Sequence, residues 1–254
     1  MESRLSNLSF YRFLPLENLP ILREKVRELG AQLNLMGTVL LAQEGVNAMV
    51  SGEPAAIETF LCEMRALFGE LPAKVAPVPE HSFHRFLVKI KKEIIAVGDP
   101  ALKPHERTAK RVSAAELKAW LDEGRDVTLV DTRNTYEIEV GTFRGAENLG
   151  LEISRDFAQK ALPELDRWKD RTVVTFCTGG IRCEKASAHL LNQGLENVYQ
   201  LDGGILRYLE ENGAAHFEGN CFVYDWRMAV DGELKPVPRA ADAKKSFGRH
   251  KLEE

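Results

Sequence analysis

Apolar residues in the first hundred positions follow two alternating patterns, short continuous runs and stretches with helical spacing. Short runs predict strands, and apolar residues three or four positions apart predict the buried face of a helix. The expected elements are, in order, a strand at 10–14, a helix from Asn18 to its stop at Gly30, strands at 37–42 and 48–52 with a turn at Gly45, a helix from Pro54, and strands at 83–90 and 93–97. The order β-α-β-β-α-β predicts a ferredoxin-like (acylphosphatase-like) α+β sandwich over residues 1–97.

The second half of the chain alternates buried strands with helices. Ser113 and Glu116 have the spacing of a capping box and predict a helix start. Later apolar runs end in polar residues at Asp131, Cys177 and Asp202. Strands that alternate with helices predict a parallel sheet with helices on both faces over residues 111–217. Because ligands bind beyond the carboxyl ends of parallel strands, those three residues mark the expected site.

Two segments have no sustained apolar period. Residues 98–110 are polar, contain two prolines and are expected to link the two domains. Residues 218–254 form a C-terminal extension, and its polar end from Pro236 is expected to be mobile.

Composition narrows the functional classes. The net charge is −4, so contact with RNA needs a local cluster of Lys and Arg rather than an overall positive charge. The four cysteines are too few for a disulfide scaffold, and without a Cys-x-x-Cys pair or a His pair at zinc spacing no metal site is expected. The N-terminus lacks the pattern of a signal peptide, and no apolar run reaches the ~18 residues of a membrane span. We therefore expect a cytoplasmic protein without a membrane segment.

One loop carries candidate chemistry. Its sequence is Cys177-Thr178-Gly179-Gly180-Ile181-Arg182, and it stands between a buried strand and a helix. The paired glycines let successive amide groups point inward, and the start of the helix adds a positive potential. Both effects favour an anion, so the loop predicts a Cys177 thiolate or persulfide, with Arg182 adding charge or fixing the loop. The alternative is a buried cysteine in an ordinary turn.

The same loop is part of a wider resemblance. The second domain resembles a rhodanese domain in the sequences at 130–133, 136–137, 141–146, 177–182 and 201–205. Together with Ala42–Asn47, Cys177–Lys185 and Gly219–Asp225, it resembles the bacterial tRNA uridine(34) hydroxylase family over about residues 8–237. The resemblance implies conversion of the wobble uridine of tRNA to 5-hydroxyuridine, with Cys177 as the catalytic residue. It also implies molecular oxygen as co-substrate and the anticodon region of tRNA as partner; no other cofactor, membrane or protein partner is expected.

The other cysteines have simpler expectations. Cys183 is either a partner that forms a disulfide with an oxidised Cys177 or a residue packed against the sheet. Cys62, on a predicted helix, and Cys221, before two apolar residues, are expected in the core.

Several charged residues are candidates for support or for RNA binding. Asp131 is expected to bond the loop backbone and Arg133 an acidic partner, or the two form an internal salt bridge. Glu44, Gly45 and Asn47 form either a hairpin turn or an RNA or interdomain contact. Basic residues flank the predicted linker and suggest a phosphate-binding strip. Its expected members are Lys91, Lys92, Arg107, Lys110 and Arg111.

Three functions fit the loop. The first is hydroxylation, in which the thiolate adds to carbon 6 of uracil or a sulfur species reacts with oxygen directly. The second is a sulfurtransferase that passes sulfur through a Cys177 persulfide. The third is an inactive rhodanese-like binding module, which the cysteine and its glycines argue against. No flavin or nucleotide motif is present in the sequence.

Overall fold

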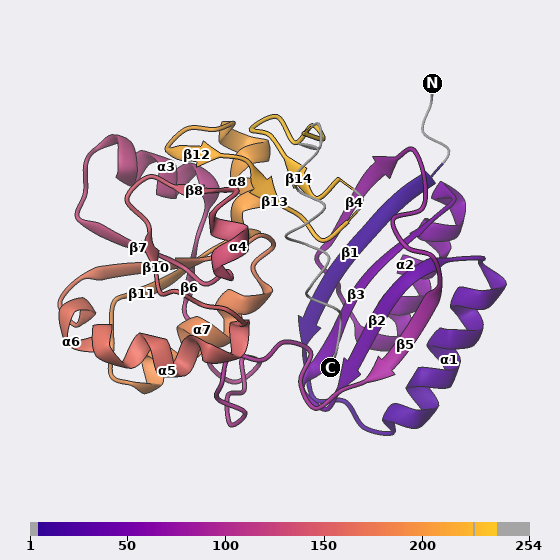
Figure 1. Cartoon of the computed structure of the whole chain (residues 1–254). Coiled ribbons are helices and arrows are strands. Elements are labelled where there is room, and N and C mark those ends of the chain that lie inside the picture. Colours follow the sequence, from indigo (N-terminus) through magenta and orange to yellow (C-terminus); the bar gives the residue numbers. More distant parts are fainter. Residues whose placement is uncertain (1–4, 226, 238–254) are drawn as a thin grey trace.

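The computed structural model describes residues 5–225 and 227–237, and it has two domains that lie side by side (Figure 1). The N-terminal domain contains a five-stranded sheet in the order β4-β1-β3-β2-β5, with two helices on one face. Its elements are β1 (Leu5–Phe13), α1 (Leu19–Gln32), β2 (Met36–Ala42), β3 (Gly45–Gly52), α2 (Pro54–Phe68), β4 (Ala73–Val78) and β5 (Phe86–Ile90). The order β4-β1-β3-β2 is that of a ferredoxin-like sandwich, as predicted.

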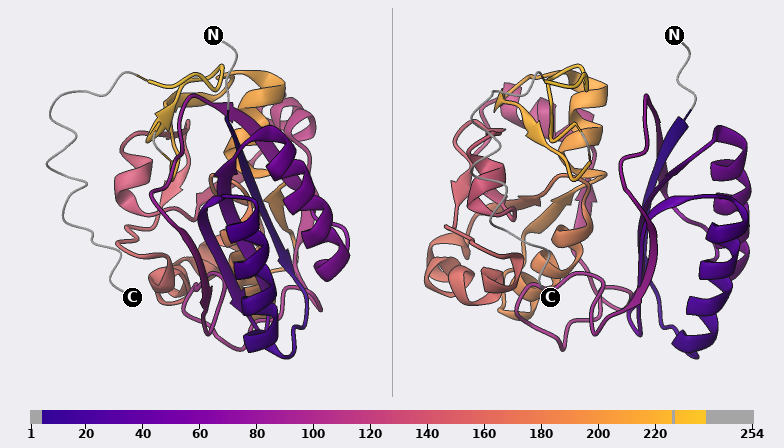
Figure 2. Two further views of the ribbon diagram at one scale, coloured as in Figure 1. Left: turned by 90° about the vertical axis from the view of Figure 1, so that its right-hand side faces the viewer. Right: turned by 45° about the vertical axis from the view of Figure 1, so that its right-hand side comes forward.

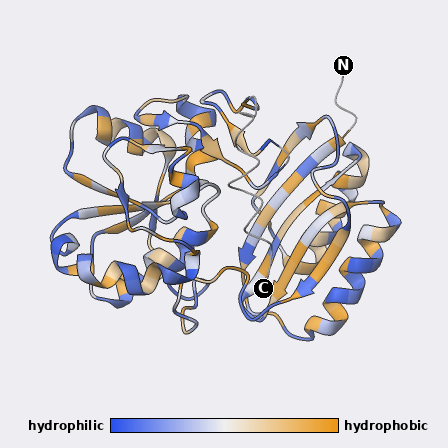
Figure 3. Cartoon of the chain, viewed as in Figure 1, coloured by the Kyte–Doolittle hydropathy of each residue, from blue (hydrophilic) through white to orange (hydrophobic). Residues whose placement is uncertain are grey.

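The core of this domain forms between the helices and one face of the sheet. Ile57, Phe60, Met64 and Phe68 repeat at helical spacing along α2 and are buried. They pack against alternate strand residues such as Leu8, because successive side chains of a strand point to opposite faces. Figure 3 shows the resulting alternation of polar and apolar positions along the strands.

Three details of the predicted elements were wrong. The edge strand β4 was missed, because its sequence includes Pro77, which removes a backbone donor that only an edge strand can spare. Residues 93–97 form no strand, since the Ile94 amide donates to the Glu44 carboxylate (2.7 Å) instead of a neighbouring strand. Gly30 does not end α1, which runs on to Gln32. Phe86 lies against Gly30 so closely that a Cβ atom there would be 2.1 Å from its ring.

The second domain is built on a parallel sheet in the order β6-β11-β10-β7-β9, with helices on both faces, which confirms the prediction. Separate clusters fill the two faces: Leu117, Val174 and Tyr208 belong to one, and Val173 and Leu190 to the other. The elements are β6 (Lys110–Val112), α3 (Ala114–Asp122), β7 (Val127–Asp131), α4 (Thr135–Ile138), β8 (Gly141–Phe143), β9 (Glu147–Asn148), α5 (Phe157–Ala161), α6 (Leu165–Trp168), β10 (Thr172–Phe176), α7 (Ile181–Asn192), β11 (Val198–Leu201) and α8 (Gly204–Asn212). Two short 3-10 turns, Ser154–Asp156 and Leu162–Glu164, flank α5. The predicted capping box of Ser113 and Glu116 opens α3.

The two remaining segments are held by the second domain. Within the predicted linker 98–110, Leu102 and Ala109 are buried in the core of the second domain, and Asp99 contacts His189 (3.1 Å). Beyond α8, β12 (Phe217–Gly219) pairs with β8, and β13 (Cys221–Phe222) pairs with β14 (Ala229–Val230). The tail that was expected to be mobile lies, from residue 238, outside the described residues.

The helix-free face of the N-terminal sheet is turned toward the second domain (Figure 2). Polar contacts cross this boundary, between Tyr11 and Glu184, Asn7 and Asp225, and Lys74 and Glu210. No helix within the described part of the chain is long and apolar enough to cross a membrane.

Candidate active site

The cysteine loop follows β10 directly and leads into α7, as the sequence predicted. Gly180 has φ 95°, a backbone conformation that residues with a side chain rarely adopt. This conformation turns the Gly180 amide toward the Cys177 sulfur, to which it donates at 3.1 Å. The loop is also fixed from behind, since the Ile205 amide donates to the Cys177 carbonyl (2.9 Å) and the Thr178 hydroxyl donates to the Phe222 carbonyl (3.4 Å).

The surroundings of the Cys177 sulfur favour the thiolate. Burial by itself raises the pKa of this thiol, because a charge is unfavourable away from water. A hydrogen bond from Cys183, the charge of Arg182 and the amides of Arg182 and Gly180 outweigh burial and lower the pKa to about 6. The sequence predicted the thiolate from the amides, the start of the helix and the charge of Arg182, and the structure adds Cys183 to these groups.

Cys183 is the second sulfur of the site and lies in the first turn of α7. It is fully buried, and its sulfur is 3.8 Å from the Thr132 hydroxyl. Burial and the neighbouring Cys177 anion raise the pKa of Cys183, so Cys183 stays a thiol and donates to Cys177. Both alternatives that the sequence left open, a partner for Cys177 and a residue buried against the sheet, are compatible with this position.

Arg182 forms a buried ion pair that the sequence did not predict. Its guanidinium donates to both carboxylate oxygens of Glu137, at 2.6 and 2.8 Å. Burial would raise the pKa of Glu137, but the Arg182 charge holds it below its ordinary value. The carboxylate also accepts from the Asn134 amide (3.1 Å). The spacing of Asn134 and Glu137, typical of a helix start, was the available signal.

Asp131 and Arg133 form the internal salt bridge that was one of their two predicted roles. Arg133 Nη2 lies 2.6 Å from Asp131 Oδ2, and both side chains are excluded from solvent. Asp131 accepts from the Arg133 amide (3.0 Å) and the Thr142 hydroxyl (2.7 Å), and Arg133 also donates to the Gly141 carbonyl (2.7 Å). The pair thus fixes the segment beside Glu137. Asp202, the third strand-end residue, pairs with Arg111 and Arg207.

An aromatic group adjoins the Arg182–Glu137 pair. The Tyr224 hydroxyl donates to Glu137 (3.0 Å) and lies 2.8 Å from the Tyr136 hydroxyl. Phe222 packs edge-on against both tyrosine rings. Tyr224 is 49% exposed although its hydroxyl is bound, so it presents a fixed aromatic surface next to the cysteine loop.

The N-terminal domain contributes to this site. The Tyr11 hydroxyl donates to Glu184 (3.3 Å) and lies 3.0 Å from where a Cβ atom on Gly180 would be. Burial and the charge of Glu184 raise the pKa of Tyr11. Glu184 also binds Arg111 (2.5 Å), so a single carboxylate of α7 joins both domains.

Lys185, the next residue of α7, makes a further contact between the domains. It is fully buried, and its ammonium lies 2.6 Å from each of two carboxylates, Glu44 and Glu93. Gln43 and Glu44 form the turn between β2 and β3, and Asn47 donates to the Ile94 carbonyl (3.5 Å). Both alternatives considered for this segment are therefore present, a hairpin turn at Glu44 and a contact of Glu44 with the second domain.

The two remaining cysteines differ. Cys221 is buried, as predicted, and burial raises its pKa to about 12. Cys62 is exposed, so its predicted place in the core was wrong. It follows Phe60 by two positions on α2, which is about 200° around the helix and therefore opposite the buried stripe.

The predicted basic strip is only partly assembled. Lys92 and Lys110 are exposed, and Arg107 binds the Asn192 side chain (3.2 Å) at the surface. Lys91 is half-buried, and its amide donates to the Leu41 carbonyl (2.9 Å). Arg111 is already paired with two carboxylates, Glu184 and Asp202.

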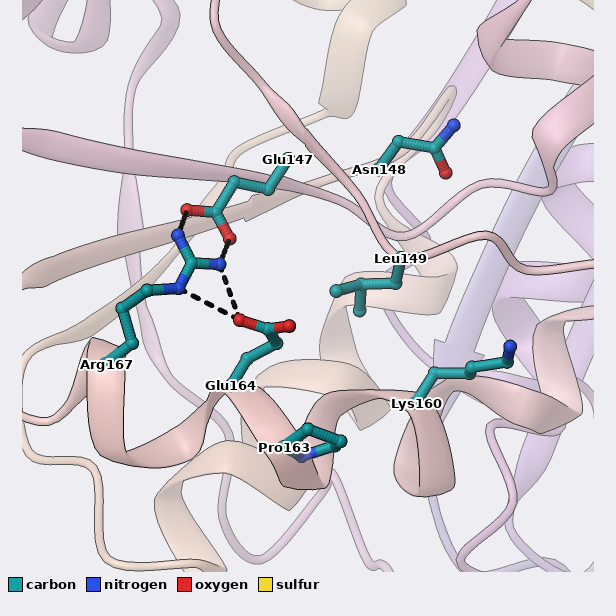
Figure 4. Close-up of a pocket in the computed structure, with 7 residues that line it drawn as sticks. All are labelled: Glu147, Asn148, Leu149, Lys160, Pro163, Glu164 and Arg167. Atoms are coloured by element: carbon teal, nitrogen blue, oxygen red, sulfur yellow. Dashed lines mark hydrogen bonds and ion pairs between the residues drawn. The ribbon is translucent and has the colours of Figure 1, made fainter.

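A pocket of about 480 Å³ lies elsewhere, at the edge strand β9 (Figure 4). It contains no residue of the cysteine loop, and its Arg167 is held between the carboxylates of Glu147 and Glu164. Among the side chains that the structure places, no group of three or more His, Cys, Asp or Glu residues is arranged to hold a metal ion.

The fold and the loop define a protein with an acylphosphatase-like domain followed by a rhodanese domain. Residues 5–94 match the family described as UPF0176 acylphosphatase like domain, and residues 113–211 match the rhodanese-like domain. A rhodanese-like domain from Anabaena is 22% identical, with a TM-score of 0.39, over 51% of this chain and 86% of that one.

Curated relatives match nearly the whole chain. A tRNA uridine(34) hydroxylase of Bordetella petrii is 45% identical over 92% of this chain and 96% of that protein. A protein of the same name from Thiobacillus denitrificans is 44% identical over 91% of this chain and 96% of its own length. The chain belongs to the tRNA uridine(34) hydroxylase family, as its motifs implied.

Proposed function

We propose that this protein hydroxylates carbon 5 of uridine 34 in tRNA, with molecular oxygen as co-substrate and the Cys177 thiolate as the reacting group. The observation that carries the proposal is the sulfur itself, which accepts the Gly180 amide at 3.1 Å and has its pKa lowered to about 6. At neutral pH such a sulfur is mostly ionised, and the thiolate is the reactive form of cysteine. We expect the reaction in the cytoplasm.

Access to the sulfur requires movement. Cys177 is fully buried, and Tyr11 of the N-terminal domain lies against the loop that holds it. A base of the anticodon has to leave its stack before an enzyme can act on it. We propose that the two domains separate to admit the base, and the polar contacts between them favour this, since polar interfaces open more readily than apolar ones.

Contacts with the rest of the tRNA are proposed at two surfaces. Thr108 donates to the Glu184 carbonyl (3.0 Å) and Glu93 binds Lys185, so both basic segments lie along the same part of α7. Lys91, Lys92, Arg107 and Lys110 would bind phosphates there. The exposed ring of Tyr224 is suited to stack on a base beside the target, because every base has a flat face that an aromatic side chain can cover.

The test is nucleoside analysis of tRNA from a deletion strain. Wild type should restore 5-hydroxyuridine and the nucleosides made from it, and Cys177→Ala should not. Cys62→Ser is the matched control, because it removes an exposed cysteine far from the loop in sequence. A tRNA profile that is the same in every strain would contradict hydroxylation. Transfer of sulfur from thiosulfate to cyanide by the purified protein would then favour a persulfide-forming sulfurtransferase, which the same amides would support.

A further inference from the structure

Cys183 is a second buried cysteine at the site, and it has no role in the hydroxylation proposed above. Cys183 directly follows the loop in the first turn of α7, where its amide donates to the Gly180 carbonyl (3.1 Å). Its sulfur lies 3.8 Å from the Thr132 hydroxyl, which itself donates to the carbonyl of Phe176, the residue before Cys177 (3.0 Å). Gly180 in turn directs its amide at the Cys177 sulfur (3.1 Å), so Cys183 and Cys177 contact the same residue and the same strand end. A hydrogen bond from Cys183 is also among the causes that lower the pKa of Cys177.

Hydroxylation by molecular oxygen leaves one oxygen atom to be accounted for. One atom enters the carbon–hydrogen bond, and the other must be reduced by two further electrons. A thiol can supply these electrons, because its oxidation to a sulfenic acid is a two-electron step.

We propose that Cys177 is the electron donor of the reaction and Cys183 the residue that closes its oxidised form to a disulfide. The inference rests on the proposed function. In the first step, the uridine C5–H, O2, the Cys177 thiolate and one proton from water give 5-hydroxyuridine and a Cys177 sulfenic acid. The O–O and C5–H bonds break, C–O and S–O bonds form, and carbon and sulfur each lose two electrons to oxygen. In the second step, the Cys183 thiol and the sulfenic acid give a disulfide and water.

The charges around Cys183 suit this order of events. Burial raises the pKa of Cys183, and the Cys177 anion raises it further, so Cys183 does not compete as a nucleophile at the start. A sulfenic acid is neutral, and its formation removes the contribution of the anion. The contact with Thr132 and the charge of Arg182, which lower the pKa of Cys183, remain. Cys183 thus becomes easier to ionise only after Cys177 has been oxidised. A dithiol reductant of the cell would then restore both thiols.

The experiment counts products and thiols in a single reaction. Fully reduced protein, freed of reductant, is mixed with unmodified tRNA in air-saturated buffer, and 5-hydroxyuridine and the intact protein mass are measured. Wild type should form at most a single 5-hydroxyuridine per chain and become about 2 Da lighter, with a Cys177–Cys183 disulfide in the peptide map. Cys183→Ser keeps a hydrogen-bond donor but no second thiol. It should also form a single product, yet become about 16 Da heavier and react with dimedone at Cys177. Cys62→Ser should behave as wild type.

The outcomes separate the inference from the function on which it rests. Several products per chain without reductant, or products with all four thiols intact, would overturn the electron source and leave hydroxylation in place. A disulfide in wild type that forms equally without tRNA would also overturn it. If reduced wild type makes no product at all, hydroxylation and the inference fail together. The number of products and thiols per chain is measured on wild type. The inference can therefore be contradicted even if the Cys183→Ser variant does not fold.

Discussion

The charge of Arg182 is expected to set the pH at which the protein works. Removing Arg182 alone would leave the carboxylate of Glu137 buried without its partner, and loss of one member of a buried ion pair costs about 3–5 kcal/mol of stability. The informative variant is therefore Arg182→Met combined with Glu137→Gln. It removes both charges together and keeps similar volumes, so the fold is expected to survive.

The size of the effect follows from the lowered pKa of Cys177. A value of about 6 lies roughly 2.5 units below an ordinary cysteine, which corresponds to about 3 kcal/mol in favour of the thiolate. The Cys183 hydrogen bond and the two amides remain in the double variant, so we expect a rise of about 1–2 units. The thiolate fraction at pH 7 would then fall from about nine-tenths to between about a half and a tenth.

The assay is the pH dependence of kcat/KM for tRNA hydroxylation, which reports the ionisation of the free enzyme. The acidic limb should move from about pH 6 to about pH 7–8, with activity recovered near pH 9. Arg167→Met is the matched control, because Arg167 forms its ion pairs with Glu147 and Glu164, outside the cysteine loop. A folded double variant whose acidic limb stays where it is in wild type would refute the electrostatic account of Cys177.

Three further predictions concern stability, the domain boundary and RNA binding. The pKa of Cys177 is lower in the folded than in the unfolded protein, so its contribution to stability is complete above the unfolded value of about 8.5 and is lost as pH falls through about 6. In urea unfolding, the free energy of unfolding of wild type relative to Cys177→Ala should therefore rise by up to about 3 kcal/mol between these two pH values. Lys185→Met leaves Glu44 and Glu93 without their shared cation and weakens the contact between the domains. The buried Cys177 should then be more accessible and react several-fold faster with a maleimide, whereas Lys160→Met, at an exposed position, should leave this rate unchanged. Changing Lys91, Lys92 and Arg107 to Glu should weaken tRNA binding at least tenfold and reduce its salt slope by roughly 2, and a slope equal to that of wild type would remove these residues from the interface.

Local patterns were enough to predict much of the fold and the centre of the site. Buried strands followed by helices gave the parallel sheet, and two glycines after Cys177 gave the conformation of the loop. These features depend on residues close in sequence, whose spacing is visible in the chain. The edge strand β4 was missed because a proline such as Pro77 is uncommon within a strand. Gly30 was wrongly predicted to end α1, because the ring that packs against it, Phe86, is distant in sequence.

The partners of the site could not be predicted in the same way. Glu137 lies 45 positions before Arg182, and Tyr11 lies 173 positions before Glu184. Such pairs depend on how strands and domains pack, and a charged residue in a sequence does not indicate which opposite charge it will meet. Cys62 shows the same limit within one helix, where a shift of two positions separates the buried side from the exposed side.

Lys185 lies on the helix whose first turn surrounds the Cys177 sulfur. The separation of the domains proposed above would break the ion pairs of this lysine, which lies about one helical turn after Ile181. The amides of Gly180 and Arg182 would then shift together with the incoming base. Admission of the tRNA would therefore change the hydrogen bonds that stabilise the thiolate, because one helix carries both the domain contact and the start of the site.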